Sequence, residues 1–303
     1  MTGAFAKKRE SAFGSFHPVL CFSFFAAAII LGMCLRHPVY LAIGLAFSLC
    51  YYVLLRGRHA WRLVGMLVPL VAAITLINPL FNTLGAHVLF TWLGGRPYTL
   101  EALYAGASVG AMVAAMLFWF GCYNVIMTSD KFIYLFGRLA PSVSLVLSLV
   151  LRFVPNYQRK LRELIVAGSC IGRAGAASSF RARLRQSAVR LNALAGWALE
   201  GGIVAADSLR SRGYGLSGRT SFSLYRFDGR DALLLAVMAA LAACVAAAIM
   251  GGTADVRYLP VFEVPDATPF GMFGYVAYAL LLAIPSAIDI REAVQWRISL
   301  SRI

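Results

Sequence analysis

The chain has little charge, and most of the charge that it has is positive. Charged residues make up 14% of the 303 residues, and 28 Lys and Arg outnumber 13 Asp and Glu. Apolar residues make up 60%, well above the share found in soluble globular domains. This composition excludes an ordinary soluble domain and predicts an integral membrane protein.

Several signatures of catalysis and of cofactor binding are missing as well. None of the four lysines follows a glycine, so the chain cannot form a phosphate-binding loop of the Walker type. The six cysteines form no C-x-x-C pair, and the four histidines stand singly, so we expect no metal and no other cofactor. Because clustered carboxylates at membrane depth are also missing, we expect a protein that is not an enzyme.

Six apolar segments have about the length that a helix needs to cross a bilayer. They are residues 19–35, 39–55, 63–81, 100–127, 232–250 and 270–287. A seventh run, 142–154, is short and contains Arg152, which predicts an interfacial or partly buried helix. Apart from Glu101 at an edge, the six segments lack ionisable residues, which argues against a self-sufficient ion-coupled carrier.

The basic residues divide unevenly between the loops. Residues 7–9 are all basic, and no small-residue cleavage site follows the first apolar segment, which we therefore expect to be retained. If the N-terminus is cytoplasmic, only Arg36, Arg96 and Arg257 lie outside, and 25 of the 28 basic residues lie inside. The positive-inside rule thus predicts that both termini are cytoplasmic.

Residues 129–230 contain 16 of the basic residues and no full-length span, which predicts a cytoplasmic module between the transmembrane parts 1–128 and 231–303. Two amphipathic helices are expected in the module, over 155–173, with Pro155 in the first turn, and over 181–212. Small residues in both suit a close helix crossing. The predicted fold is all-α, with about six transmembrane helices, a cytoplasmic pair of long helices, and an interfacial tail over 288–303.

Both cytoplasmic helices end in an arginine between small residues. The two tripeptides are Gly172, Arg173, Ala174 and Ser211, Arg212, Gly213. A cation is favoured at the carbonyl end of a helix, and Gly213 can adopt the left-handed cap conformation. Small neighbours leave each guanidinium free to enter a groove of a partner and to bind a carboxylate there.

The chain resembles the transmembrane T component of energy-coupling factor (ECF) transporters, the ABC-type importers of vitamins and transition metals. The matching stretches are, in order, INPLFN, YTLEALYAG, SDKFIYLFGRLAPSVSLVLSLVLRFVP, GRA, SRGYG and GRTSFSLYRFDGRD, with PSAIDIREAVQWRISLSRI similar to the tail of longer members. The first arginine motif of the family is usually Ala-Arg-Gly. Here it is Gly172-Arg173-Ala174, which keeps the arginine between small residues.

The resemblance implies a non-catalytic scaffold that joins a substrate-binding S component in the membrane to two cytoplasmic ABC ATPases. It implies that Arg173 and Arg212, with their small neighbours, each enter a groove of one ATPase. A multi-pass location in the cytoplasmic membrane of a prokaryote follows, with no nucleic-acid partner. Two alternatives stay open, a self-sufficient carrier and a membrane enzyme with a cytoplasmic interfacial site, and the cargo is not specified.

Cysteine labelling tests the topology. In a cysteine-free background, Arg257→Cys should react with a membrane-impermeant maleimide added to intact cells, whereas Phe180→Cys should react only after the membrane is opened. The reason is that the positive-inside rule places residue 257 outside and residue 180 inside. Labelling of position 180 but not of position 257 in intact cells would show the opposite orientation.

Overall fold

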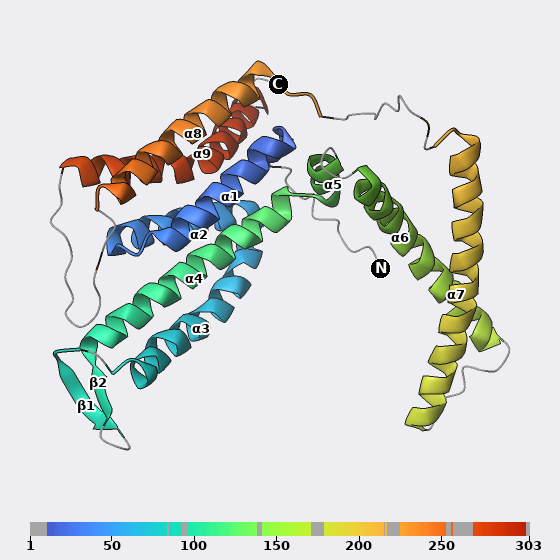
Figure 1. The fold of residues 1–303 in the computed structure, drawn as a ribbon, viewed down its shortest axis with the longest axis horizontal. Coiled ribbons are helices and arrows are strands. Elements are labelled where there is room, and N and C mark those ends of the chain that lie inside the picture. The colour runs from blue at the N-terminus through green and yellow to red at the C-terminus, as the bar shows by residue number, and fades with distance from the viewer. Residues whose placement is uncertain are drawn as a thin grey trace. The chain divides into compact units, whose positions relative to one another are not determined.

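The chain divides into two units. The computed structural model describes residues 11–83, 85–92, 96–137, 141–170, 179–214, 216, 225–252, 256 and 269–300. The first unit contains the described residues up to Phe132 together with those from Tyr225 onward, and the second lies within Ile133–Leu224. Figure 1 shows a helical bundle in the first unit and two long helices in the second.

The described part of the bundle consists almost entirely of helices. They are the short η1 (Phe13–Ser15), α1 (Pro18–Cys34), α2 (Pro38–Arg56), the short η2 (Gly57–His59), α3 (Ala60–Phe81), α4 (Leu100–Ile126), the start of α5 (Ser129–Gly137), α8 (Gly229–Met250) and α9 (Pro269–Leu300). A helix therefore lies over each of the six apolar segments found in the sequence.

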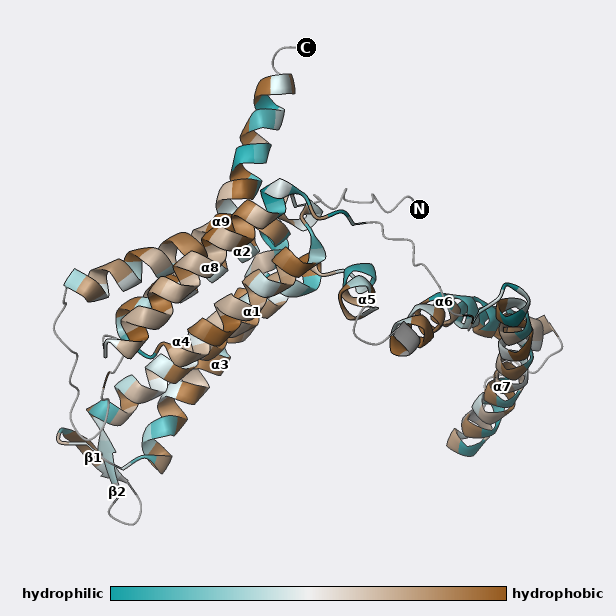
Figure 2. Ribbon diagram, turned by 45° about the horizontal axis from the view of Figure 1, so that its top comes forward, coloured by the Kyte–Doolittle hydropathy of each residue, from teal (hydrophilic) through white to brown (hydrophobic). Residues whose placement is uncertain are grey.

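Four helical stretches are long and apolar enough to cross a membrane: Pro38–Phe81, Leu100–Ile126, Gly229–Met250 and Pro269–Leu300. The first of these contains both α2 and α3, which continue into each other through η2, and α1 is a shorter apolar helix of 17 residues. The bundle helices are apolar over most of their length (Figure 2). These helices are those of a membrane protein, while six separate crossings stay a prediction.

Two bundle helices begin with the same tripeptide. His17-Pro18-Val19 opens α1, and His37-Pro38-Val39 opens α2. In each, the histidine Nδ1 accepts the backbone N–H of the valine at 3.3 Å. The proline takes the first helical turn, where its missing N–H would have had no partner. These two histidines are therefore helix caps, which explains why they stand singly at the ends of apolar segments.

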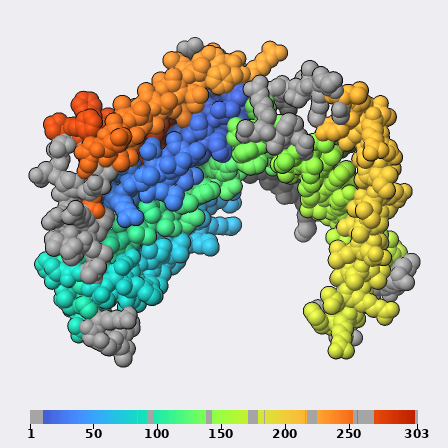
Figure 3. All heavy atoms as spheres, in the orientation of Figure 1, coloured from blue at the N-terminus to red at the C-terminus, as the bar shows by residue number. Residues whose placement is uncertain are grey.

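Close helix packing in the bundle depends on small residues. α4 packs against α1, α2 and α3, and α9 packs against α2 and α8. A Cβ added at Gly106 of α4 would lie 2.8 Å from the carbonyl oxygen of Thr75 in α3. Figure 3 shows α1 (blue) between α4 (green) and α8 (orange). Since packing supplies much of the attraction between helices in lipid, such close contacts matter for stability.

An aromatic cluster joins the N-terminal segment to α1 and α4. Phe13 is fully buried, and its ring centroid lies 5.4 Å from that of Phe24 and 6.3 Å from that of Phe25. Phe24 and Phe25 also contact Trp119 of α4, and their ring centroids lie 5.5 and 6.2 Å from that of the tryptophan. All four pairs are edge-to-face, the arrangement that ring quadrupoles favour.

Two carboxylates hold the backbone of the same N-terminal segment. Asp289 of α9 accepts the Phe13 N–H at 2.9 Å, and Asp231 of α8 accepts the His17 N–H at 3.4 Å. Asp231 is only 6% exposed and also belongs to a capping box with Asp228 at the start of α8. The segment therefore connects α8 with α9.

Lys131, in the first turn of α5, adds a third polar contact. Its ammonium donates to the carbonyl of Gly14 and, at 3.2 Å, to that of Ile126. The residue is 6% exposed, and a buried ammonium requires such acceptors because it has lost its hydration. The start of α5 is thus fixed to η1 and to the end of α4.

The connection between α3 and α4 forms a short hairpin, which the sequence did not predict, in a chain that is otherwise helical in its described part. β1 (Val88–Trp92) pairs antiparallel with β2 (Arg96–Thr99). Phe90 stacks on Tyr98 across the pair, with ring centroids 4.7 Å apart. The segment is rich in β-branched and aromatic residues, which favour strands, but it is too short to have stood out beside the long helical segments.

The second unit contains the end of α5 and two long helices that pack against each other, α6 (Pro141–Cys170) and α7 (Phe180–Ser211). α7 covers nearly the range predicted for the second helix. The start predicted for the first helix is wrong, because α6 begins at Pro141 and Pro155 lies inside it. An internal proline costs about 3 kcal/mol, but the helix-forming residues on both sides offset this cost, so the run 142–154 and its continuation form one helix.

The described part of the tail is helical, as predicted, and it continues the last apolar helix. α9 continues to Leu300 as a single helix, with Pro285 inside it, so the described part of the predicted interfacial tail is its last three to four turns. These turns are more polar than the rest of α9 (Figure 2). The sequence shows this change of composition, but it contains no helix break.

The Phe13 cluster generates a stability prediction. Phe13→Ala should lower the free energy of unfolding by about 3 to 5 kcal/mol, because it leaves a cavity among buried rings. Thermal unfolding in detergent measures the effect. The control is Phe273→Ala in α9, whose side chain is 76% exposed and should change stability by about 0.5 kcal/mol or less. Equal effects would show that the N-terminal segment is not part of the bundle core.

Candidate functional site

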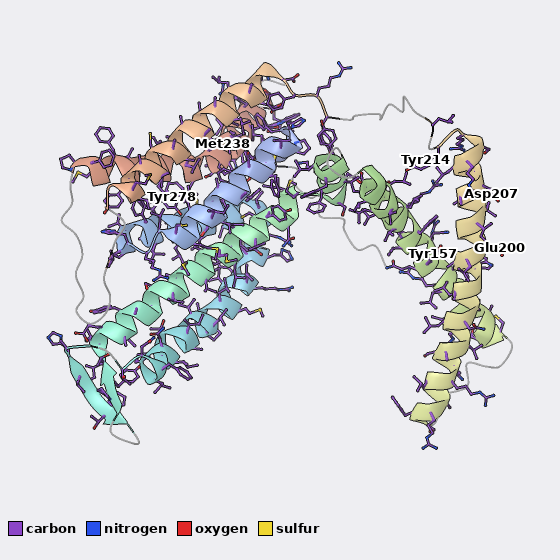
Figure 4. The ribbon with its side chains drawn as sticks, in the orientation of Figure 1. Tyr157, Glu200, Asp207, Tyr214, Met238 and Tyr278 are labelled. Carbon is purple, nitrogen blue, oxygen red and sulfur yellow. The ribbon has the colours of Figure 1, made fainter. Side chains whose placement is uncertain are left out.

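The candidate docking site lies at the C-terminal end of α7. Along the second half of this helix, half-buried positions recur every three or four residues, as on the packed face of a helix. They are Leu194, Ala198, Gly202, Ala205 and Leu209. Glu200 and Asp207 lie on another side of the helix and are exposed (Figure 4). This half of α7 therefore has one packed face, as predicted, while its exposed sides carry apolar residues (Leu199, Ile203 and Val204) as well as the two carboxylates.

A contact between long side chains joins α6 to α7. The Lys160 Nζ of α6 lies 3.8 Å from the ring centroid of Trp197 of α7, a cation–π contact. The same ammonium pairs with Oε2 of Glu163 in its own helix, at 2.8 Å. The two helices pack against each other, as predicted, but not closely at the glycines that the structure describes. A Cβ added at Gly168, Gly196, Gly201 or Gly202 would meet no described atom within 4 Å.

α7 ends in a Schellman motif. Gly213 has a φ of 74°, the left-handed conformation that the sequence predicts for it. The Gly213 N–H donates to the carbonyl of Arg210 at 2.9 Å, and the Tyr214 N–H donates to the carbonyl of Leu209 at 3.0 Å. These two hydrogen bonds satisfy carbonyls that the helix leaves without partners, so the end of α7 is well defined.

Arg212 occupies the C-cap position, and its side chain is exposed. Both neighbours serve the cap: Gly213 makes the turn, and the Ser211 hydroxyl donates to the carbonyl of Ser208 at 2.9 Å. Among the residues that the structure describes, Arg212 forms no ion pair. The helix dipole favours a cation at this end, and the guanidinium is accessible to a carboxylate of another protein.

The first arginine motif cannot be placed in the same way. Gly172, Arg173 and Ala174 lie outside the described residues, and α6 ends at Cys170. The structure therefore positions one of the two predicted docking arginines, and it does not test whether the two motifs lie near each other.

Glu101 has a structural contact that the sequence did not suggest. Its carboxylate is buried and accepts the His87 Nδ1–H at 2.7 Å and the His87 backbone N–H at 3.1 Å. Because His87 precedes β1 and Glu101 belongs to the first turn of α4, this pair fixes the hairpin to the helix. The spacing of 14 residues gives no local signal, so sequence reasoning could not find the pair.

Sequence reasoning also missed the polar contacts of the buried Lys131 and Asp231 and of the half-buried Asp289. Only Asp231 had a recognisable signal, the capping box Asp-x-x-Asp that begins at Asp228. Within the described residues, no group of three or more His, Cys, Asp or Glu could hold a metal ion. Comparisons with known protein families and with curated proteins give no match to this chain. The family resemblance therefore depends on the quoted residues alone.

The cap generates a prediction with a matched control in the same helix. Gly213→Ala should destabilise the end of α7 by roughly 1 kcal/mol or more, since an L side chain disfavours the left-handed conformation. Gly201→Ala should instead stabilise α7 by about 0.5 to 1 kcal/mol, because a Cβ there meets open space. Amide hydrogen exchange of residues 208–214 measures both effects. Equal changes in the two variants would contradict the capping role of Gly213.

Proposed function

We propose that this protein is the T component of an ECF-type ABC importer. It is a non-catalytic scaffold that links two cytoplasmic ATPases to a substrate-binding S component, for uptake of a vitamin or a transition-metal ion. The observation that carries the proposal is Arg212, exposed at the capped end of an amphipathic helix of 32 residues. The second small-Arg-small tripeptide, at Arg173, supports the same role.

The two arginines suit two ATPase subunits. A guanidinium flanked by small residues can bind a carboxylate in a groove in bidentate fashion, and one such contact is available for each subunit. ATP-driven closure of the ATPases then displaces the ends of α6 and α7. A helix of 32 residues is about 48 Å long at 1.5 Å per residue, so it can carry this displacement to a distant S component.

The buried charges of the bundle favour a scaffold over a self-sufficient carrier. A carrier uses ionisable groups near the middle of the membrane to bind its ion or substrate. Here the buried charged groups Lys131 and Asp231 hold the N-terminal segment, and Glu101 holds His87. Each lies in the first turn of a helix and has a hydrogen-bond partner within the protein. These groups therefore stabilise the fold, which argues against a role in binding a transported ion.

Charge reversal tests the proposal. Arg173→Glu and Arg212→Glu should each weaken co-purification with the ATPases and uncouple ATP hydrolysis from uptake. Breaking a desolvated interfacial pair costs on the order of 2 to 5 kcal/mol, whereas an exposed ion pair contributes about 1 kcal/mol or less. The control is Arg219→Glu, a few residues beyond the end of α7, which should have a much smaller effect.

The outcomes separate specific docking from general electrostatics. All three reversals change the net charge equally, so equal effects would mean a diffuse basic surface and would contradict the docking role. Loss of assembly in only one of Arg173→Glu and Arg212→Glu would contradict the assignment of one arginine to each ATPase. Transport by the purified chain without any ATPase would favour the carrier.

A further inference from the structure

The two halves of α7 differ in charge. Residues 180–190 contain four arginines, at 181, 183, 185 and 190, and no acidic residue, which gives a charge of +4. Residues 191–212 contain two arginines and two acidic residues, Glu200 and Asp207, which gives zero. The proposed ATPase contact, at Arg212, lies at the end of the neutral half.

An exposed apolar stripe accompanies these arginines. Phe180, Leu184 and Leu191 are 79%, 62% and 60% exposed, and their spacing of four and seven residues places them on one face. In the second half, the same face carries Leu194 and Leu209, which are half-buried. The stripe is therefore covered along the second half of the helix and is exposed along the first half.

Two of the arginines, Arg181 and Arg190, lie beside this stripe. At 100° per residue, Arg181 follows Phe180 on one flank, and Arg190 precedes Leu191 on the other. Arg185 is exposed and lies 40° beyond Arg181, farther from the stripe, and within the described residues neither forms an ion pair. An apolar stripe with cations on both flanks is the pattern of a helix that lies in a membrane interface.

We propose that the first half of α7, residues 180–191, binds the surface of an anionic bilayer. The three apolar side chains enter the boundary between headgroups and acyl chains, and the flanking guanidiniums bind lipid phosphates. The charge of this segment favours lipid as its partner, because four cations without an acidic neighbour suit a surface of uniform negative charge. Each cation contributes roughly 1 kcal/mol near such a surface. The proposal concerns a different part of α7 from the ATPase contact and does not depend on it.

Site-specific fluorescence in nanodiscs tests this surface on the full chain without partners. Exposed Cys34, Cys50, Cys170 and Cys244 are replaced by alanine, while Cys21 and Cys122 are buried and stay. An environment-sensitive fluorophore is attached through Ala188→Cys, beside the stripe. The matched control is Leu199→Cys, which lies 11 residues, or three turns, later on the same side and is also exposed. Discs contain phosphatidylcholine alone or equal parts of phosphatidylcholine and phosphatidylglycerol.

In the phosphatidylglycerol discs, the probe at position 188 should be quenched by spin-labelled lipid and protected from iodide, whereas the probe at 199 should not. High salt should reverse the effect, because it screens the attraction. The double variant Arg181→Gln, Arg185→Gln should lower the ratio of lipid-bound to lipid-free residues 180–191 about 25-fold. The loss of each cation removes roughly 1 kcal/mol, which is a factor of about five. Arg210→Gln, in the neutral half of α7, should leave the ratio unchanged.

Three results would overturn the proposal. Position 188 could stay accessible to iodide in the phosphatidylglycerol discs. It could be protected equally in both kinds of disc, which would make the contact purely apolar. It could also become protected only when ATPases or a substrate-binding protein are added, which would assign the surface to a protein partner. The effect of Arg212→Glu on ATPase binding is a separate measurement. Either proposal can therefore be contradicted without affecting the other.

Discussion

The packing of α5, α8 and α9 around the N-terminal segment depends on one constraint: a charged side chain removed from water must find polar partners within the protein. The N-terminal segment supplies them from its backbone. The carbonyl of Gly14 accepts from Lys131, and the N–H groups of Phe13 and His17 donate to Asp289 and Asp231. Because these partners belong to α5, α9 and α8, a stretch of only a few residues joins helices that are distant in the sequence.

The same segment explains how a largely apolar bundle obtains a specific arrangement at this end. Apolar helices in lipid gain little from the hydrophobic effect, so their arrangement depends on close packing and on polar contacts. Phe13 supplies the packing, against Phe24 and Phe25, and its own N–H supplies a polar contact to Asp289. Lys131 lies two residues before Ile133, where the second unit begins. Its hydrogen bonds therefore hold the chain to the bundle directly before the boundary between the units.

Local patterns predicted much of the fold. The lengths of the apolar segments located the six long bundle helices α1, α2, α3, α4, α8 and α9, and the Arg-Gly pair predicted the left-handed turn at Gly213. Features that depend on distant partners were not predictable. Pro155 looked like a helix start because its local preference is real, yet α6 passes through it. The glycines of α6 and α7 suited close packing, but a Cβ at those that the structure describes would meet no atom within 4 Å, and one contact between the helices is made by Lys160 and Trp197.

The two ends of α7 carry arginines in different surroundings, and these surroundings suit different kinds of binding. The small residues beside Arg212 are needed for the cap, and the cap exposes the guanidinium at a fixed position. A general basic surface would not require such a defined helix end, because its effect depends on net charge and is screened by salt. The arginines between 181 and 190 show the opposite arrangement, spread over three turns beside apolar side chains. One helix thus combines a single positioned cation at its end with a distributed cationic surface at its start, and these suit partners of different chemistry.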